Sequence, residues 1–161
     1  MNGRTILGAA AIASLVVFAA CGSDTQTAVT PSVTYVSTLS GANEVPARTT
    51  SATGTATYTL TGNILTYTVT VNGLTTAATA SHIHSAPAGV NGNVIVPYVT
   101  ANVTSGVVTS GSIDLSLPIV NGATSITGDS LRTLLNNGGA YTNVHSSTFP
   151  GGEIRGQIVR Q

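Results

Sequence analysis

Lysine and tryptophan are absent from this sequence, and charged residues of any kind are rare. Asp, Glu, Lys and Arg together make up 6% of the 161 residues, and the formal net charge is zero. A protein that binds nucleic acid needs a basic surface to neutralise phosphates, so this composition excludes nucleic acid as a partner. Aromatic residues account for only 4%, and aliphatic side chains must therefore fill most of the core.

The sequence has a single cysteine, Cys21, so no disulfide can form within one chain. Behind the lone charge of Arg4, an apolar run extends from Ile6 to Ala20. This run is too short to span a bilayer comfortably and ends in small residues, which is typical of an export signal. We therefore predict a signal peptide over residues 1–20.

The end of this run, "FAAC", resembles the lipobox of bacterial lipoproteins, although Phe18 stands where leucine is usual. In such proteins the cysteine becomes the lipid-modified first residue after cleavage. An ordinary secretory signal with an incidental cysteine is the alternative. We favour a protein anchored through Cys21 to a bacterial membrane of the cell envelope, facing outside the cytoplasm. Residues 21–32 would be a polar tether, and residues 33–161 a single domain.

Threonine is the most frequent residue and glycine occurs 18 times, a composition that favours a β-protein. The clearest pattern is the period-two alternation over residues 51–73, which predicts two strands joined by a tight turn at Gly62-Asn63. The predicted register places threonine opposite threonine on the exposed face. On the buried face it pairs Leu60 with Leu65, Tyr58 with Tyr67, and Ala56 with Val69.

Further short strands are predicted along the rest of the chain, with Pro97 placing one of them at a sheet edge or at a bulge. A helix beginning near Thr127 or Asp129 is predicted from an apolar stripe of leucines, and Asn91-Gly92 predicts a type I′ turn. This spacing of strands predicts an all-β sandwich or Greek-key barrel with one short helix. The further strands are predicted at 33–39, 77–84, 93–99, 111–120, 140–145 and 152–160.

Three histidines form the strongest candidate site. Residues two apart on a strand share a face, so His82 and His84 project side by side while Ile83 points to the core. His145 ends another predicted strand, and a three-nitrogen site follows if the two strands are neighbours. Imidazole ligands suit copper and zinc, and three of them leave a coordination position open. Surface histidines without a role are the alternative, because such pairs also arise by chance.

Three segments, residues 39–46, 81–96 and 141–158, resemble the CHRD domain, a module named after chordin and also found in bacterial secreted proteins. The last segment, "NVHSSTFPGGEIRGQI", follows the family pattern most closely. Ala86 and Asn93 depart from the family pattern in the middle segment. The resemblance extends over about residues 33–161, and it implies an extracellular module in a family whose animal member binds protein ligands.

The CHRD family is in turn similar to Cu,Zn superoxide dismutase, an immunoglobulin-like Greek-key barrel. This more distant resemblance implies an immunoglobulin-like or superoxide-dismutase-like fold here. It also implies that His82, His84 and His145 are copper ligands and that Arg155 guides an anion. The chain has no fourth histidine to bridge copper and zinc and no disulfide. A site with one metal ion, copper or zinc, is therefore expected instead of a site with two.

Arg155 has two candidate carboxylate partners. Glu153 lies two residues away on the same predicted strand, where a surface ion pair would contribute well under about 1 kcal/mol. Glu44, in the segment "NEVP", would instead lock the first loop to the last strand. In a chain with so few charges, we favour a buried structural pair between Arg155 and Glu44 over an anion-guiding role.

Two functional hypotheses follow. The first is a lipid-anchored binding or structural module with a three-histidine metal site and a protein ligand outside the cell. The second is a mononuclear copper redox protein resembling superoxide dismutase, or a copper carrier. In a third, intermediate hypothesis, a metal ion binds and has a purely structural role. The sequence contains neither a Gly-X-Ser-X-Gly elbow nor a phosphate-binding loop, so no catalytic residue is assigned and enzymatic activity stays an open question.

Overall fold

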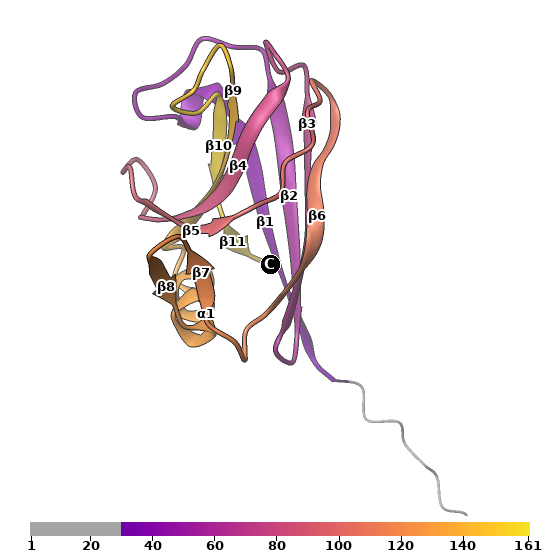
Figure 1. Ribbon diagram of the computed structural model, residues 1–161, viewed down its shortest axis with the longest axis vertical. Helices are drawn as coiled ribbons and strands as arrows, with labels where there is room; N and C mark the ends of the chain where they lie inside the picture. The colour runs from indigo at the N-terminus through magenta and orange to yellow at the C-terminus, as the bar shows by residue number, and fades with distance from the viewer. Residues whose placement is uncertain (1–29) are drawn as a thin grey trace, which may run out of the picture.

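The computed structural model describes residues 30–161 of the chain. The predicted signal peptide, the predicted lipidation site Cys21 and most of the predicted tether lie outside these residues. Nine strands form one antiparallel sheet (Figure 1). They are β1 (Ser32–Ser40), β2 (Thr53–Thr61), β3 (Ile64–Asn72), β4 (Ala78–Ser85), β5 (Asn93–Pro97), β6 (Gly106–Asp114), β9 (Ala140–Ser146), β10 (Ile154–Gln157) and β11 (Val159–Arg160).

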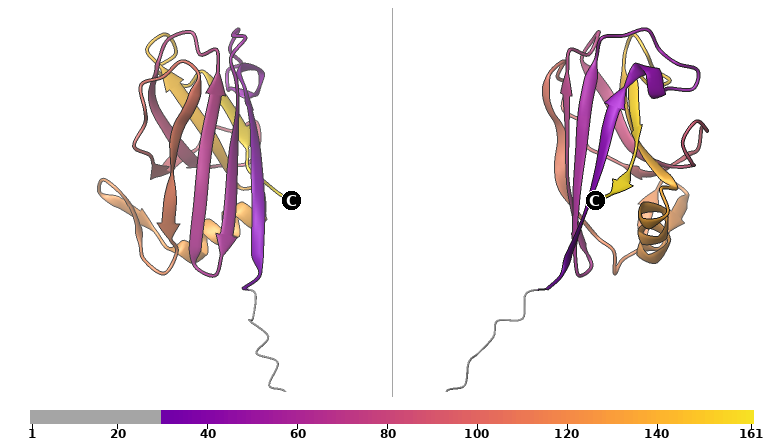
Figure 2. Two further views of the ribbon diagram at one scale, coloured as in Figure 1. Left: turned by 90° about the vertical axis from the view of Figure 1, so that its right-hand side faces the viewer. Right: turned by 180° about the vertical axis from the view of Figure 1, so that it is seen from behind.

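The sheet curls into two facing layers. Its strand order is β5-β4-β9-β10-β1-β2-β3-β6, with β11 pairing to β1. The strands β1, β2, β3 and β6 lie side by side in one layer, and β5, β4, β9 and β10 form the other (Figures 1 and 2). This confirms the predicted all-β sandwich or barrel. The predicted position of Pro97 is also confirmed, because it ends β5 at one edge of the sheet.

The β2–β3 hairpin has the predicted register. Leu60 is opposite Leu65, Tyr58 opposite Tyr67 and Ala56 opposite Val69, and threonines are paired on the other face. At the turn only Gly62 has a positive φ, of 58°, which is the pattern of a type II′ turn. The alternation alone determined this register, because a slip by one residue would bury threonines and expose leucines.

The space between the layers is filled mainly by aliphatic side chains and a few tyrosines. The buried tyrosine hydroxyls have partners, as the cost of burying a polar group requires. The hydroxyl of Tyr58 lies 2.7 Å from Oγ1 of Thr142, and the hydroxyl of Tyr35 donates to Oδ1 of Asn136 at 2.9 Å. These bonds link β1 and β2 in one layer to β9 and the helix α1 (Gly128–Asn136).

The helix α1 begins where the sequence predicts. Oγ1 of Thr127 accepts a hydrogen bond from the Ser130 backbone N–H at 3.1 Å, which is the function of an N-cap residue. Leu131 and Leu135 are fully buried, so the predicted leucine stripe packs against the core. Within residues 30–161, no helix is long and apolar enough to cross a membrane.

Two local predictions are wrong. The strand predicted at 111–120 begins earlier, since β6 starts at Gly106 and ends at Asp114. The Asp114 carboxylate accepts hydrogen bonds from the N–H and the hydroxyl of Ser116, and this Asx turn bends the chain away. The alternation of apolar and polar residues continues through this turn, so the sequence pattern gave no sign of it. The chain then forms a separate hairpin of β7 (Ile119–Asn121) and β8 (Thr124–Ile126).

The predicted type I′ turn at Asn91-Gly92 is also wrong. A longer loop over residues 86–92 joins β4 to β5, and the positive φ in it belongs to Gly89. Gly92 is needed for a different reason, because a Cβ there would lie 2.1 Å from the carbonyl oxygen of Ser85. The glycine therefore permits a close approach of two backbone segments.

Candidate metal centre

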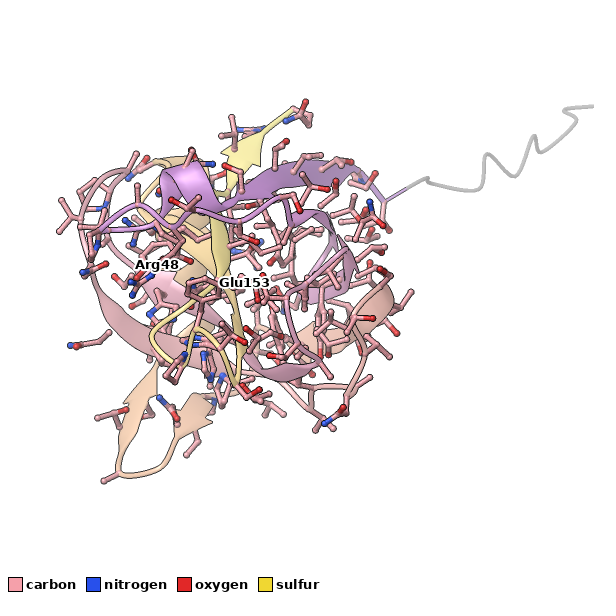
Figure 3. The ribbon with its side chains drawn as sticks, turned by 90° about the horizontal axis from the view of Figure 1, so that it is seen from above. Arg48 and Glu153 are labelled. Carbon is pink, nitrogen blue, oxygen red and sulfur yellow. The ribbon has the colours of Figure 1, made fainter. Side chains whose placement is uncertain are left out.

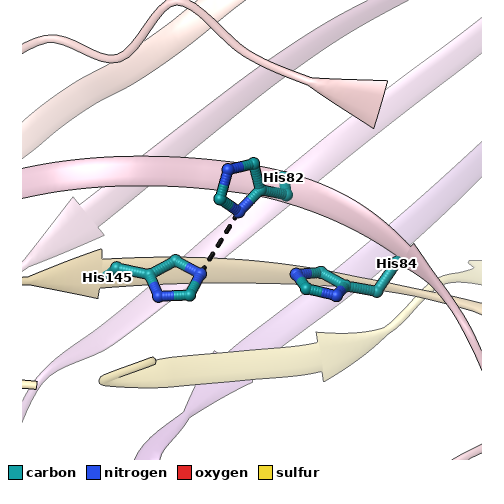
Figure 4. A group of neighbouring side chains, drawn as sticks. All are labelled: His82, His84 and His145. Carbon is teal, nitrogen blue, oxygen red and sulfur yellow. Dashed lines mark hydrogen bonds between the residues drawn. The ribbon is translucent and has the colours of Figure 1, made fainter. Parts of the chain in front are cut away.

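Two paired strands carry the three histidines. The strands β4 and β9 are antiparallel neighbours, with His82 opposite Asn143, His84 opposite Tyr141 and Ala80 opposite His145. Each histidine offers one ring nitrogen to a group in which all three atoms lie within 4.8 Å of one another. Figure 4 shows the three imidazoles gathered on one face of the strand pair. The condition set by the sequence, that the two strands be neighbours, is met.

For two of the rings, hydrogen bonds to backbone carbonyls determine which nitrogen has a lone pair available to a metal ion. Nδ1 of His84 lies 3.0 Å from the carbonyl oxygen of Gly92, and Nδ1 of His145 lies 2.8 Å from that of Pro150. A carbonyl only accepts, so each Nδ1 carries the hydrogen and each neutral ring has its lone pair on Nε2. Nε2 of His84 is buried and has no partner among the described residues.

The third ring completes the arrangement. Nδ1 of His82 lies 3.2 Å from Nε2 of His145 (Figure 4). Because Nε2 of His145 is an acceptor, Nδ1 of His82 donates to it in the metal-free protein. The nitrogens available to one ion are therefore Nδ1 of His82 and Nε2 of both His84 and His145, with the hydrogen of His82 moving to its other nitrogen or to solvent.

The surroundings keep the imidazoles neutral. Burial, together with the neighbouring His145 and His84, lowers the pKa of His82 to about 4. Burial also lowers the pKa of His84, which the hydrogen bond to Gly92 partly opposes, and that of His145. A histidine must be neutral to coordinate a metal, so the site is in the ligand form at neutral pH.

Tyr141 holds the ring of His84 in place. The two rings are stacked with centroids 4.7 Å apart and an interplanar angle of 9°. With Nδ1 bonded to Gly92 and one face covered by Tyr141, the imidazole of His84 is positioned before any ion arrives. Sequence reasoning did not single out Tyr141, although it lies four residues before His145 on the same face of β9.

Arg155, for which a buried pair with Glu44 is favoured over an anion-guiding role, is bound to the first loop. Nε of Arg155 donates to the Asn43 carbonyl at 2.6 Å and lies 3.9 Å from Oε2 of Glu44. Nη1 donates to Oδ1 of Asn91 at 2.9 Å. Both members of the Arg155–Glu44 pair are buried. These contacts attach the 3-10 turn η1 (Gly41–Asn43) and its neighbours to β10, as a structural pair would.

Asn143 connects this pair to the histidine strands. Its Nδ2 donates to Oε1 of Glu44 at 2.6 Å, and on the strand it is opposite His82. Burial raises the pKa of Glu44, which the charges of Arg155 and Arg48 and the bond from Asn143 partly oppose. Sequence reasoning did not single out Asn143 as a site residue, but its position two residues from His145 gave a signal, since both share a strand face.

Glu153 does not form the surface ion pair with Arg155 that the sequence offered as an alternative to the pair of Arg155 with Glu44. It is 0% exposed and accepts hydrogen bonds from the hydroxyls of Thr50, Thr75 and Ser146 and from the Thr75 N–H. Burial raises its pKa, but these bonds outweigh burial, and the pKa is lower than usual. In Figure 3, Glu153 lies beside β10, with Arg48 in the same view.

One comparison with known proteins gives a match. The model of the CHRD domain family matches residues 35–158, a range that contains β2, β10 and all three histidines. Neither a curated protein nor a solved structure matches the chain.

Proposed function

This chain belongs to the CHRD domain family, and from that premise we propose that it is an exported, lipid-anchored binding module that holds one copper or zinc ion. CHRD domains are extracellular, which supports a binding or structural module outside the cytoplasm. The membrane anchor at Cys21 and a protein ligand remain parts of this proposal. The single observation that carries the metal site is the convergence of three ring nitrogens from His82, His84 and His145.

The donor set suits these ions. Zinc and copper prefer imidazole nitrogen, and Zn–N bonds of about 2.0–2.1 Å place tetrahedral ligands about 3.3 Å apart. Nδ1 of His82 and Nε2 of His145 are already 3.2 Å apart. The ring of His84 needs only a small shift, since its nitrogen is within 4.8 Å of the others. Its buried, unpartnered Nε2 is an atom that a metal ion would satisfy.

The arrangement around the ligands supports the same conclusion. The carbonyls of Gly92 and Pro150 hold the Nδ1 hydrogens of His84 and His145. A ligand histidine commonly donates its other N–H in this way, which fixes the tautomer and makes the coordinating nitrogen more basic. Two of the three ligands therefore have the partners that a metal site requires before metal binds.

A mononuclear copper redox protein, or a copper carrier, is the second candidate function. Three protein ligands leave a coordination position open, which catalytic and carrier sites need and closed structural sites lack. His82 and His145 are both partly exposed, while His84 is buried. Copper bound in this site would supply one-electron redox chemistry. The chain's own residues would hold the three neutral imidazoles in place.

The decisive experiment is calorimetry of the purified, metal-free chain with Cu(II) and with Zn(II). We expect one ion per chain with a dissociation constant below about 1 µM, equivalent to about −8 kcal/mol. His82→Ala, His84→Ala and His145→Ala should each abolish binding at this affinity. Asp129→Asn, which removes an exposed carboxylate of α1, is the matched control and should bind normally.

If no site tighter than micromolar is found, the metal proposal is wrong and an anchored CHRD module remains. If copper binds, superoxide consumption by the loaded protein separates the two functions. Activity that disappears in His145→Ala supports the redox candidate. Binding that raises thermal stability without activity assigns the ion a structural role.

A further inference from the structure

The two edges of the main sheet differ in how they are protected from pairing with another strand. At one edge, β5 has five residues and ends at Pro97, and its register with β4 shifts part of the way along. Nδ2 of Asn121 in β7 also donates to the Val94 carbonyl at 3.0 Å. Short strands, proline, bulges and covering segments all keep an edge from pairing, so the edge at β5 is blocked.

The strand β6 forms the other edge and lacks most of this protection (Figure 2). It has nine residues, with no proline and no charge before Asp114, and the chain has no lysine to place there. Its first half is covered, since the N–H of Ala101 donates to the Val108 carbonyl at 2.7 Å. Residues 110–114 continue as a strand with no covering segment bonded to them, and we call them the free edge of β6.

The backbone groups of Ser110 and Ser112 point away from β3. The N–H of Leu115 donates to the Asn63 carbonyl, at the turn before β3, at 2.7 Å. In an antiparallel pair, residues bonded to the neighbouring strand alternate with residues that face away from it. Ser110 and Ser112 therefore present an N–H and a C=O to the outside. Beyond the strand ladder, no backbone hydrogen bond within residues 30–161 involves either serine, and such a row of unpaired groups is a template for another strand.

Exposed apolar side chains lie near both ends of the free edge. Val107 is at the start of β6 with Val99 beside it, and Leu117 follows the end of the strand; all three are exposed. With Tyr67, the two valines border a cavity of about 430 Å³. Antiparallel pairing of two identical edges brings the start of one strand against the end of the other. It would therefore carry Leu117 of each copy toward this cavity of the other copy, which gives the self-complementary surface that a two-fold interface requires.

We propose that the free edge of β6 pairs antiparallel with the same edge of a second copy of this chain, joining the two sheets into one. The carbonyl of Val108 is already bonded and a turn follows Asp114, so the midpoint of the free edge is Ser112. Ser112 then lies opposite Ser112 of the second copy, and Ser110 lies opposite Asp114. The inference goes beyond the proposed function, because none of the three histidines lies on β6.

Sedimentation equilibrium of the metal-free chain carrying Cys21→Ser tests the association without a thiol that could link two copies. We expect monomers and dimers with a dissociation constant of about 100 µM or tighter. Ser112→Lys places like charges directly opposite each other and should weaken the dimer by about tenfold or more. Thr57→Lys adds the same charge to the same face, but on the interior strand β2. It is the matched control and should dimerise as the unmodified chain does.

Crosslinking tests the register in the same Cys21→Ser chain. At the centre of the pairing, the two Cα atoms are about 5.5 Å apart, within the range of about 4.4–6.8 Å that a disulfide needs. Ser112→Cys should therefore give a disulfide-linked dimer under mild oxidation. Ser110→Cys should give none, because its two copies would be more than about 13 Å apart along the strands. Non-reducing electrophoresis measures both.

Three results would each overturn the proposal. They are a chain that stays monomeric at about 1 mM, a Ser112→Lys chain that dimerises as tightly as Thr57→Lys, and a Ser110→Cys chain that crosslinks as readily as Ser112→Cys.

Discussion

Glu153 is a buried carboxylate held by three hydroxyls and one backbone N–H, from segments far apart in the sequence. Thr50 lies in the loop before β2, Thr75 between β3 and β4, and Ser146 at the end of β9. One carboxylate thus connects two loops to the end of β9, next to His145. Its ionised form is the one that accepts all four hydrogen bonds.

Replacing Glu153 with Gln should destabilise the fold by about 1–3 kcal/mol at pH 7, because an amide nitrogen would face donors. The pKa of Glu153 is lower in the folded state than its ordinary value of 4.5. Its stabilisation is therefore complete above about pH 4.5 and is lost as the pH falls through the folded-state pKa. Urea unfolding across this range should show the difference between the two proteins shrinking toward acid pH.

A difference that stays constant with pH would contradict this account of Glu153. The exposed Asp129→Asn is the control, and it should change the free energy of unfolding at pH 7 by less than about 0.5 kcal/mol.

Gly156 permits a close approach of β10 to β1, the neighbouring strands at which the two layers meet. A Cβ at this position would lie 2.1 Å from the carbonyl oxygen of Thr38 on β1. Gly156→Ala should therefore separate β10 from β1 and destabilise the fold by about 1–3 kcal/mol or more. Gly151→Ala is the matched control, because its Cβ would meet only the side chain of Arg48 at 3.4 Å. Thermal unfolding distinguishes them, and equal melting temperatures would refute the argument.

The helix α1 depends on both its N-cap and its packing against the core. A helix of nine residues is too short to be stable in isolation, so its packing through Leu131 and Leu135 and its N-cap must both contribute. The cap is Thr127, whose hydroxyl oxygen accepts from the Ser130 N–H.

Thr127→Ala should cost about 1 kcal/mol of stability, while Thr127→Ser keeps the capping oxygen and should stay within about 0.5 kcal/mol of the unmodified chain. Urea unfolding measures both values. If the two substitutions have the same effect, the cap contributes nothing and the packing of the leucines alone maintains the helix.

For the whole molecule, the metal proposal predicts a change in stability, because an ion that binds only the folded chain stabilises it by mass action. At a free ion concentration about 100 times the dissociation constant, the gain is about 2.7 kcal/mol. Copper or zinc should therefore raise the melting temperature of the chain, and a chelator should reverse the increase. His145→Ala should show no increase. A similar rise in this variant would place the ion elsewhere.

The predicted anchor is tested by the distribution of the whole protein in a bacterial cell. Cys21→Ser removes the thiol that lipid modification requires. It should move the protein from the membrane fraction to the soluble extracytoplasmic fraction, as measured by fractionation and immunoblotting. Retention of the variant in the membrane fraction would exclude anchoring through Cys21.

Local patterns were sufficient where a structural feature depends on neighbouring residues. The alternation over residues 51–73 determined the register of the β2–β3 hairpin, and the spacing of leucines behind Thr127 determined α1. The shared face of His82 and His84 follows from the period of a strand alone. Local patterns failed at Asp114 and at Asn91-Gly92, because there the backbone path depends on an Asx turn and on a close approach to Ser85.

The amino-acid sequence by itself thus determined most of the strands, their faces and the residue types available for a site. Only the tertiary structure decided which distant segments meet. His82 and His145 are 63 residues apart, and Glu44 and Asn143 are 99 apart. No periodic pattern encodes such a contact, because it depends on strand order in the curled sheet. That order makes β4 a neighbour of β9 and β10 a neighbour of β1, and so assembles both the histidine cluster and the buried pair of Arg155 and Glu44.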